Sequence, residues 1–318
     1  MIRLKTQNKN RNFPLPYGCM RGVGCNYKIF SMHKLISLLF SCFILINTTE
    51  AHPGIGIVMD NEGNVFYTDL THVWKISPEG KRTVAVKNVH THELYLDANG
   101  DLFGEHEWYE GEITDKWGNY VWRLSKDGVF EKFIPDVEGF LDNTTLIRDP
   151  AGNSYWAIEF GNADVLMKQT LNGRDHIFTP HKFDDIRWMH YSENDNNLYV
   201  VDHLTIKKIT PSGVVEILAT NLKENKPSFE GVADRHYIFG LWTDTDGNVY
   251  VALYGAGKVK KISPEGRIST FFFSEEGWSP CGGMIDKNGT VWIMEFSSGN
   301  ETRVRKMVSN GEDILYGG

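Results

Sequence analysis

Three histidines and three glutamates gather between Val89 and Glu107, in the sequence VHTHELYLDANGDLFGEHE. The pair Asn99-Gly100 favours the positive backbone dihedrals of a tight turn, so the stretch is predicted to be a hairpin with strands at 93–97 and 102–107. Neutral imidazole binds divalent metal ions, and glutamate acts as a metal ligand or as a general base. The pattern therefore predicts a candidate site, although it does not specify a reaction.

A turn centred on Asn99 fixes the register of the hairpin, because the numbers of facing residues then sum to 198. His92 faces His106 and Glu93 faces Glu105, with Cβ atoms about 4.5 to 5.5 Å apart. Two facing glutamates repel unless a cation or a shared proton intervenes. We therefore predict a divalent metal held by His90, His92 and His106, with Glu93 and Glu105 as catalytic carboxylates. A solvated, charged strand end is the alternative, and a register slip of one residue would separate the pairs.

Two kinds of Gly- and Asn-rich turn recur along the chain and must position this site. One kind lies near residues 63, 100, 152, 196, 247 and 289, and the other near residues 80, 128, 173, 213, 266 and 311. They alternate strictly, so each unit reads as four short strands over roughly 37 to 53 residues, which is typical of propeller blades. The sequence predicts an all-β fold, a six-bladed β-propeller with four antiparallel strands per blade. A two-faced solenoid fits less well, because its repeats are usually shorter.

Residues 1–51 resemble a processing segment rather than part of the fold. Lys34 precedes an apolar run from Leu35 to Ile46, and the sequence Thr49-Glu50-Ala51 resembles a cleavage site. The run is too short to span a bilayer. We expect an N-terminal segment at 1–51 that includes a secretory signal peptide, a propeller at 52–318, no transmembrane segment in the mature chain, and a secreted or periplasmic location. Met32 is a plausible start of translation.

Charge and cysteine content narrow the partners of residues 52–318. The first 51 residues hold seven Lys and Arg and one acidic residue, which leaves 26 basic against 40 acidic residues and a net charge near −14. Nucleic acid is therefore not expected as a partner, whereas a small molecule or a carbohydrate is. Cys281 is the one cysteine that remains, so no intramolecular disulfide is expected.

Propeller topology gathers chemically useful side chains on one rim, because the loops between blades and the loops between the second and third strands emerge on the same face. Arg187 is expected to hold a substrate carboxylate or phosphate there. An aromatic-rich loop at 107–120 is expected to stack on sugar rings or to close over a pocket, and packing between blades is the alternative. The expected substrate-binding residues are Trp108, Tyr109, His236 and Tyr254.

Some candidates have a simpler structural explanation. Acidic residues recur where the second strand of a blade ends, and such repetition favours capping of backbone amides: Asp69, Glu105, Glu159, Asp202 and Glu295. His190 falls within a strand and is expected to be a core histidine. Cys281 is expected to be small core filler.

Several blades resemble those of a known superfamily. The stretch 240–267, GLWTDTDGNVYVALYGAGKVKKISPEGR, is similar to a blade of gluconolactonases, of senescence-marker lactonases and of NHL-repeat propellers, as is 188–203; the last blade, with VWIMEF, also resembles streptogramin lyase. The lactonase resemblance implies a divalent metal held by Glu, Asn and Asp on innermost strands. Alignment on the turns puts Ile55, Arg187 and Phe239 at those positions. Either the alignment is shifted, with Asp184, Asp185 and Glu230 nearby, or the metal site has moved.

Two functions follow as hypotheses. The first is an exported metal-dependent hydrolase of the lactonase or esterase type, acting on a small anionic or sugar-derived substrate, with a lyase on a cyclic ester or sugar acid as a variant. In it, Arg187, Glu93 and Glu105 are catalytic. The second is a non-catalytic, NHL-like propeller that binds a ligand or glycan on the same rim.

Overall fold

The computed structural model describes residues 53–139, 146–224, 228–229, 231–308 and 311–318. The predicted signal segment and its cleavage site lie outside the described residues, as does Glu230. Apart from two single 3-10 turns, η1 (Asp234–His236) and η2 (Tyr254–Ala256), the regular structure of these described residues is all β. Within the described ranges, no helix has the length and apolar character needed to cross a membrane.

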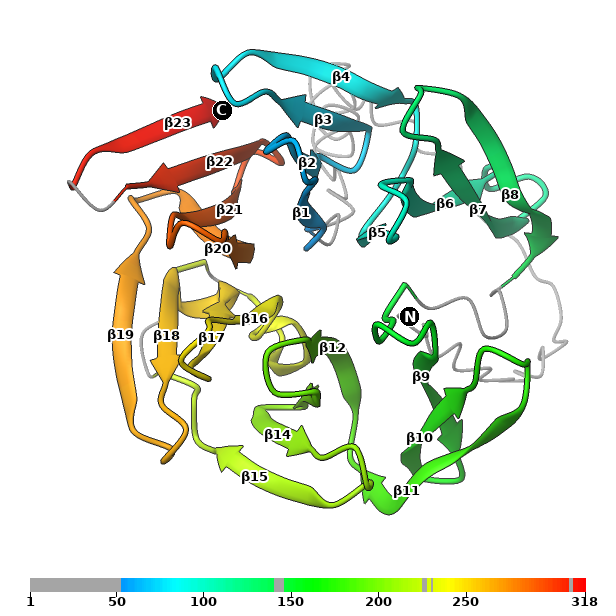
Figure 1. Ribbon diagram of the computed structural model, residues 1–318, viewed down its shortest axis with the longest axis vertical. Helices are drawn as coiled ribbons and strands as arrows, with labels where there is room; N and C mark the ends of the chain where they lie inside the picture. Colours follow the sequence, from blue (N-terminus) through cyan, green and yellow to red (C-terminus); the bar gives the residue numbers. More distant parts are fainter. Residues whose placement is uncertain (1–52, 140–145, 225–227, 230, 309–310) are drawn as a thin grey trace, which may run out of the picture. The chain divides into compact units, whose positions relative to one another are not determined.

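Six consecutive antiparallel sheets are arranged as the blades of a propeller (Figure 1), which confirms the predicted fold. Blade one comprises β1 (Ile57–Met59), β2 (Val65–Thr68), β3 (His72–Ile76) and β4 (Arg82–Lys87). Blade two comprises β5 (Leu94–Leu96), β6 (Leu102–Tyr109), β7 (Trp117–Leu124) and β8 (Phe130–Glu138). Blade three comprises β9 (Ser154–Phe160), β10 (Ala163–Gln169) and β11 (Asp175–Phe183), and one antiparallel bridge from Arg148 to Ser154 marks its innermost strand.

The second half of the ring repeats the pattern. Blade four comprises β12 (Ile186–Ser192), β13 (Asn197–Asp202), β14 (Thr205–Ile209) and β15 (Val215–Ala219). Blade five comprises β16 (Leu241–Thr243), β17 (Val249–Leu253), β18 (Lys258–Ile262) and β19 (Ile268–Phe273). Blade six comprises β20 (Trp278–Ile285), β21 (Val291–Ser297), β22 (Thr302–Met307) and β23 (Asp313–Gly317).

Each sheet is built from contiguous sequence, so the ring closes by packing between blades rather than by a shared strand. Blade five meets blade six through a hydrogen bond of 2.8 Å from the Gly240 N–H to the Cys281 carbonyl. Blade six meets blade one at Gly282, where a Cβ atom would lie 2.5 Å from the carbonyl oxygen of Ile55. A side chain at Gly282 would therefore push the two blades apart.

The twelve predicted turns share one backbone property. The turn position has a positive φ in every case, at Gly63, Gly100, Gly152, Asn196, Gly247 and Gly289 in one family and at Gly80, Gly128, Gly173, Gly213, Gly266 and Gly311 in the other. Glycine reaches this conformation without strain, and asparagine tolerates it better than most residues. The sequence signal that predicted the repeat is therefore the conformational requirement itself.

Candidate metal and substrate site

The hairpin of β5 and β6 adopts the predicted register. Leu94 pairs with Gly104, Tyr95 with Phe103 and Leu96 with Leu102, so the paired numbers sum to 198. The backbone pairing between the two strands stops at Leu94, so it does not reach the predicted facing pair of Glu93 and Glu105. Beyond Leu94, side-chain hydrogen bonds replace the backbone hydrogen bonds of the hairpin. They change which side chains of the candidate site lie close together.

Glu105 takes over where the ladder stops. Its Oε1 atom accepts the backbone N–H groups of His92 and, at 3.2 Å, of Glu93. The prediction that Glu105 caps backbone amides is therefore confirmed. Equivalent bonds occur at Asp69, which accepts the N–H groups of Thr71 and His72, and at Asp202, which accepts the N–H of Asp185.

Thr91 fixes the short segment that leads into β5. The residue is fully buried, its carbonyl accepts the Thr68 hydroxyl at 2.6 Å, and its own hydroxyl donates to the Glu105 carbonyl at 2.6 Å. The indole N–H of Trp122 donates to the same hydroxyl at 3.1 Å. With Thr91 anchored from blades one and two, the two flanking histidines are held at the end of β6.

His90, His92 and Glu107 form the resulting cluster. Their potential ligand atoms all lie within 4.8 Å of one another, and the two imidazole centroids are 4.8 Å apart. Glu105 and Glu107 alternate with His106 along β6, so the two glutamates project from one face of the strand and His106 from the other. The predicted site thus gains Glu107, which the sequence analysis missed.

His106 lies beside this cluster rather than within it. Its Nδ1 accepts the backbone N–H of His90 at 2.9 Å, and its ring packs 4.7 Å from that of Tyr120, its cross-strand partner. The structure therefore brings His90, not His92, beside His106. The predicted facing pair does not form, because the chain leaves the ladder at Leu94.

The charge states of the cluster follow from burial and proximity. Burial, and then the neighbouring His92, lower the pKa of His90 to about 4, so that ring is neutral at pH 7. Burial also disfavours charge on His92, yet the hydrogen bond and the charge of Glu105 raise the pKa of His92 overall. Burial raises the pKa of the Glu107 carboxyl. A cation bound between these side chains would offset the cost of burying the negative charge of the Glu107 carboxylate.

The residues fit a divalent transition metal. Two imidazoles and one carboxylate match the three-ligand set of catalytic zinc sites, and a histidine ligand usually donates its second nitrogen to a carboxylate. His92 meets that condition, since its Nδ1 lies 3.4 Å from Oε1 of Glu105. Metal–nitrogen bonds of about 2.0 to 2.1 Å require ligand atoms about 3.3 Å apart, so the side chains would move closer by rotation. Oε2 of Glu105 is buried and has no hydrogen-bond partner among the described residues.

A cavity of about 400 Å³ lies among the innermost strands of the ring. Its polar lining consists of Glu93, His190, Glu193, Asn194 and Thr243, and its walls include Leu94, Met189 and Met284. Burial raises the pKa of the Glu93 carboxyl, and the charge of Glu105 adds to that shift. Because Glu93 follows His92 directly, the cavity begins next to the candidate metal cluster.

His190 lies within β12, as predicted, but its half-buried side chain lines this cavity. Its Nε2 lies 3.3 Å from the Thr243 hydroxyl of blade five, and burial lowers its pKa to about 4. Cys281 is fully buried, and burial raises the pKa of its thiol, as expected of core filler.

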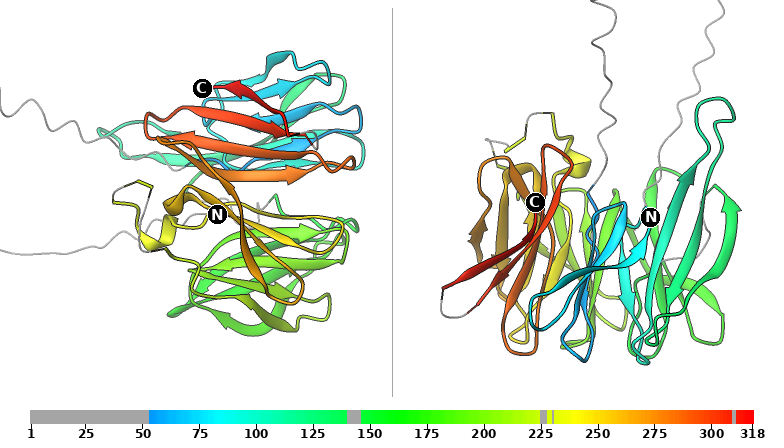
Figure 2. Two further views of the ribbon diagram at one scale, coloured as in Figure 1. Left: turned by 90° about the vertical axis from the view of Figure 1, so that its left-hand side faces the viewer. Right: turned by 90° about the horizontal axis from the view of Figure 1, so that it is seen from above.

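The aromatic stretch of blade two is less of a loop than predicted. Strand β6 extends to Tyr109 and β7 begins at Trp117, because alternating aromatic residues favour a longer hairpin. Trp108 packs on Gly118, where a Cβ atom would lie 2.4 Å from the indole, so Trp108 supports the hairpin. Tyr109 is 56% exposed. This hairpin and η1 rise from the same face of the ring (Figure 2).

Arg187, the residue expected to hold a substrate anion, is paired within the protein. Its Nε and Nη2 atoms donate to the same oxygen of Asp185 at 2.9 and 2.7 Å. His236 and Tyr254 both pack against Phe239, with ring centroids 6.2 and 5.1 Å away.

The metal positions implied by the lactonase resemblance offer no oxygen ligand. Ile55 is aliphatic, Phe239 is buried in an aromatic cluster, and Arg187 is paired with Asp185. Asp185 is itself engaged by that pair, and Glu230 lies outside the described residues. The candidate ligands His90, His92 and Glu107 lie instead at blade two.

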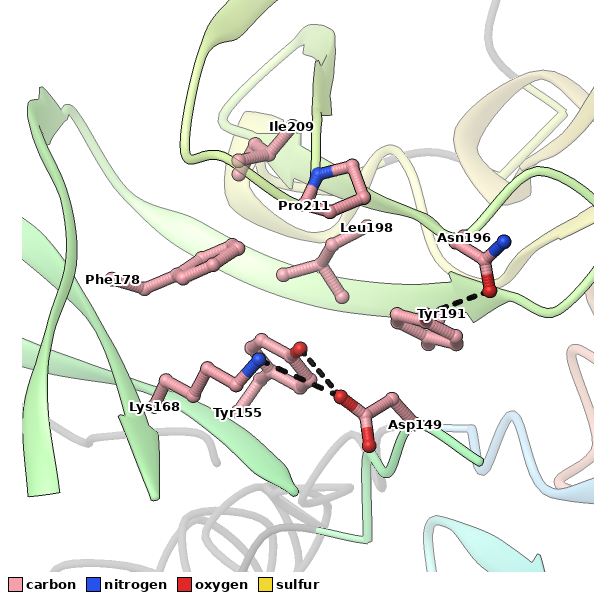
Figure 3. A pocket seen from close by; sticks show the side chains of 9 residues that line it. All are labelled: Asp149, Tyr155, Lys168, Phe178, Tyr191, Asn196, Leu198, Ile209 and Pro211. Carbon is pink, nitrogen blue, oxygen red and sulfur yellow. Dashed lines mark hydrogen bonds and ion pairs between the residues drawn. The ribbon is translucent and has the colours of Figure 1, made fainter. Parts of the chain in front are cut away.

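A second cavity, of about 350 Å³, lies between blades three and four (Figure 3). There Asp149 accepts the Tyr155 hydroxyl at 2.8 Å, and the Lys168 ammonium lies 5.0 Å from the Tyr155 ring centroid. The same trio recurs in blade five as Asp244, Tyr250 and Lys261. A trio that repeats between blades is a feature of the architecture, so this cavity is not our candidate site.

No protein-family profile matches the chain, and no curated protein matches it. Solved structures resemble it in fold. A luciferin-regenerating enzyme aligns with a TM-score of 0.55 at 15% identity over 82% of this chain and 87% of that one. A gluconolactonase from Xanthomonas campestris aligns at 0.54, with 12% identity over 76% and 83%. Virginiamycin B lyase from Staphylococcus aureus aligns at 0.50, with 17% identity over 85% of both chains.

Proposed function

We propose that the protein is an exported, metal-dependent hydrolase of lactones or esters, with a divalent metal held by His90, His92 and Glu107. The observation that supports this most strongly is the convergence of these three side chains, with Glu105 behind His92. A structural role alone would not require one buried and one half-buried imidazole beside two carboxylates. The proposal also places the substrate in the cavity that begins at Glu93.

Each residue has a distinct task in this proposal. A bound divalent ion supplies Lewis acidity toward an ester carbonyl and lowers the pKa of water. Glu105 orients His92 and holds the loop, so it is a positioning residue. Glu93 faces the cavity with a carboxyl pKa raised by burial, which suits a group that takes up or releases a proton during the reaction.

The fold guides the choice of substrate class. It is shared with a gluconolactonase and with a streptogramin-type lyase, so lactones and cyclic esters are the first compounds to test. Apolar walls from Leu94, Met189 and Met284 favour a ring with an apolar face over a fully hydroxylated sugar. Reaction in ¹⁸O-labelled water separates the two chemistries, because hydrolysis incorporates the label and elimination does not.

Metal analysis combined with a lactone and aryl-ester panel tests the proposal. The purified protein should contain close to one tightly held divalent ion per chain and should hydrolyse at least one class of the panel. His92→Ala should lose both the ion and the activity. The exposed His176 provides a matched control, and His176→Ala should keep both. Wild-type protein without metal, or activity that survives in His92→Ala, would contradict the proposal.

A non-catalytic glycan-binding propeller is the alternative, and the exposed Tyr109 favours it. This ring stands on the β6–β7 hairpin with its hydroxyl 3.3 Å from Asp115, which leaves a face free for stacking on a sugar. If the protein is a glycan-binding propeller, Tyr109→Ala should abolish glycan binding. If the protein is the proposed hydrolase, the same substitution should leave hydrolysis unchanged.

A further inference from the structure

The cavity among the innermost strands, the axial cavity, receives side chains from all six blades. Its volume of about 400 Å³ lies within the usual range of small-molecule pockets. The described residues that line it include two carboxyl side chains, Glu93 and Glu193, and neither a lysine nor an arginine. Arg148, beside this lining in the sequence, donates its Nη1 to the Ile147 carbonyl at 3.2 Å. The charge of the lining therefore favours a cationic ligand over an anionic one.

The two carboxyl side chains lie at opposite ends of the axial cavity. Glu93 precedes the turn residue Gly100 by seven positions, as Met189 precedes Asn196, so Glu93 is level with Met189. Glu193 follows Met189 by four residues, a separation of roughly 13 Å along a strand. The Glu193 end is therefore the end away from the candidate metal cluster. The Glu193 side chain is exposed there, and no hydrogen bond or ion pair joins it to another described residue.

His190 adds a hydrogen-bond acceptor to the lining. The Thr243 hydroxyl donates to Oγ of Ser192 at 3.1 Å, so the Thr243 oxygen accepts the N–H of His190 Nε2 at 3.3 Å. Burial lowers the pKa of His190 to about 4, so the ring carries only that proton at pH 7. Nδ1 is then an acceptor, and it has no hydrogen-bond partner among the described residues.

The other polar side chains of the lining already use their donors. The Asn194 amide donates to the Asp244 carbonyl at 3.2 Å, and the Tyr191 hydroxyl donates to the Asn196 side chain at 3.3 Å. The inner edges of the strands offer N–H and C=O groups alike, so the backbone does not discriminate between donors and acceptors. The ring of Tyr191 adds an aromatic wall, which also attracts cations. A ligand that brings donors and a positive charge fits this end of the cavity best.

We propose that the axial cavity binds a small organic ammonium ion, a protonated amine on an apolar body, with the Glu193 carboxylate and Nδ1 of His190 as its acceptors. An ammonium group has three donors and no acceptor, which matches these two side chains. The apolar body packs on Leu94, Met189 and Met284. The inference rests on the proposed function in one respect, since it makes the substrate a lactone or ester that carries a protonated amine.

Calorimetry with three matched probes tests the site on the purified protein, before and after treatment with a chelator. Benzylammonium, benzyl alcohol and benzoate share a ring and differ in charge. Benzylammonium should bind more tightly than benzyl alcohol, benzoate should bind least, and the chelator should change none of these affinities. Equal binding of all three, tighter binding of benzoate, or no binding would overturn the proposal. Loss of benzylammonium binding after chelation would also overturn it, because the amine would then lie at the metal cluster.

Variants of blade four assign the binding to named side chains. Glu193→Gln should weaken benzylammonium binding about threefold to fivefold, as expected for an exposed ion pair, and should leave benzyl alcohol binding unchanged. His190→Phe should weaken benzylammonium binding tenfold or more, because a hydrogen bond to a charged group is lost. Glu216 is exposed on β15 and pairs with Lys208, and Glu216→Gln should bind as the wild type does. Unchanged benzylammonium binding in Glu193→Gln would refute the assignment.

A pair of esters separates this inference from the proposed function. Methyl 4-(aminomethyl)benzoate and its N-acetyl derivative share the ester and differ in the protonated amine. The amine should be hydrolysed with a kcat/KM at least about fivefold higher, and Glu193→Gln should reduce that preference. Equal rates for the two esters would contradict the amine site and leave the hydrolase standing. Hydrolysis of neither ester, with benzylammonium still bound, would contradict the hydrolase and leave the amine site standing.

Discussion

The Nδ1 atom of His92 lies 3.4 Å from Oε1 of Glu105, and the same oxygen accepts the backbone N–H groups of His92 and Glu93. One buried carboxylate thus fixes both the ring of His92 and the segment that carries it. In metal sites, a carboxylate that accepts a hydrogen bond from the second ring nitrogen of a histidine ligand raises the affinity of the site for the metal. This relationship connects the fold of blade two to the proposed chemistry.

Glu105→Gln should weaken metal binding by about tenfold to a hundredfold, because the amide lacks the charge that orients and polarises His92. A chelator-competition titration measures the change. Glu138, exposed in the same blade and paired with Lys116, is the control, and Glu138→Gln should bind metal as the wild type does. Equal affinities in Glu105→Gln and the wild type would remove the positioning role assigned to Glu105.

The assignment of Glu107 in place of His106 gives a second prediction. Glu107→Gln should lose the metal, whereas His106→Ala should keep it, since the His106 ring packs on Tyr120 and its Nδ1 is bonded to the His90 N–H. Elemental analysis of both dialysed variants decides the matter. Retention by Glu107→Gln together with loss by His106→Ala would restore the facing pair predicted from the hairpin register.

The turn aspartates predict a response to acid. Asp244 accepts the Asn248 N–H at 2.9 Å and the Tyr250 hydroxyl at 3.0 Å; burial raises the pKa of this carboxyl, but these bonds outweigh it and lower the pKa. A lowered folded-state pKa stabilises the protein above the ordinary aspartate pKa of about 3.9, and that stability is lost as the pH falls through the folded value.

Asp244→Asn should therefore lower the free energy of unfolding by about 1 to 3 kcal/mol at pH 7, and by less at pH 3.5. Urea unfolding at both pH values measures the difference. Asp246, in the same turn, provides the control, because its side chain is exposed. A destabilisation that is the same at both pH values would show that the charge of Asp244 is not involved.

Export is predicted from the apolar run that follows Lys34. Expressed in a bacterium with a periplasm, the full chain should be exported and cleaved close to Ala51, whereas a chain that begins at His52 should stay in the cytoplasm. Cell fractionation and N-terminal sequencing provide the readouts. An uncleaved full chain in the cytoplasm would contradict the predicted signal segment.

The fold was accessible from the sequence because its turns impose a conformation that few residues adopt. Gly100 with a φ of 86° and Asn196 with a φ of 58° occupy positions that the repeat pattern identifies directly. The register around Asn99 followed from the same constraint. Local backbone chemistry therefore determines both the blade count and the pairing of the hairpin.

The candidate site was harder to predict from the sequence, because side-chain contacts rather than backbone conformation determine its geometry. The ladder ends at Leu94 once Glu105 binds the N–H groups that a strand would have used, and no pattern marks that point. The alternation of Glu105 and Glu107 did signal a shared face, since strand side chains alternate with a period of two.

Anomalous diffraction from crystals soaked in zinc tests the central claim most directly. We expect a strong peak between His90, His92 and Glu107, at about 2.0 to 2.2 Å from two imidazole nitrogens and one carboxylate oxygen. The peak should be absent from crystals of His92→Ala. A peak elsewhere in the ring with none at these three residues, or an unchanged peak in His92→Ala, would contradict the account.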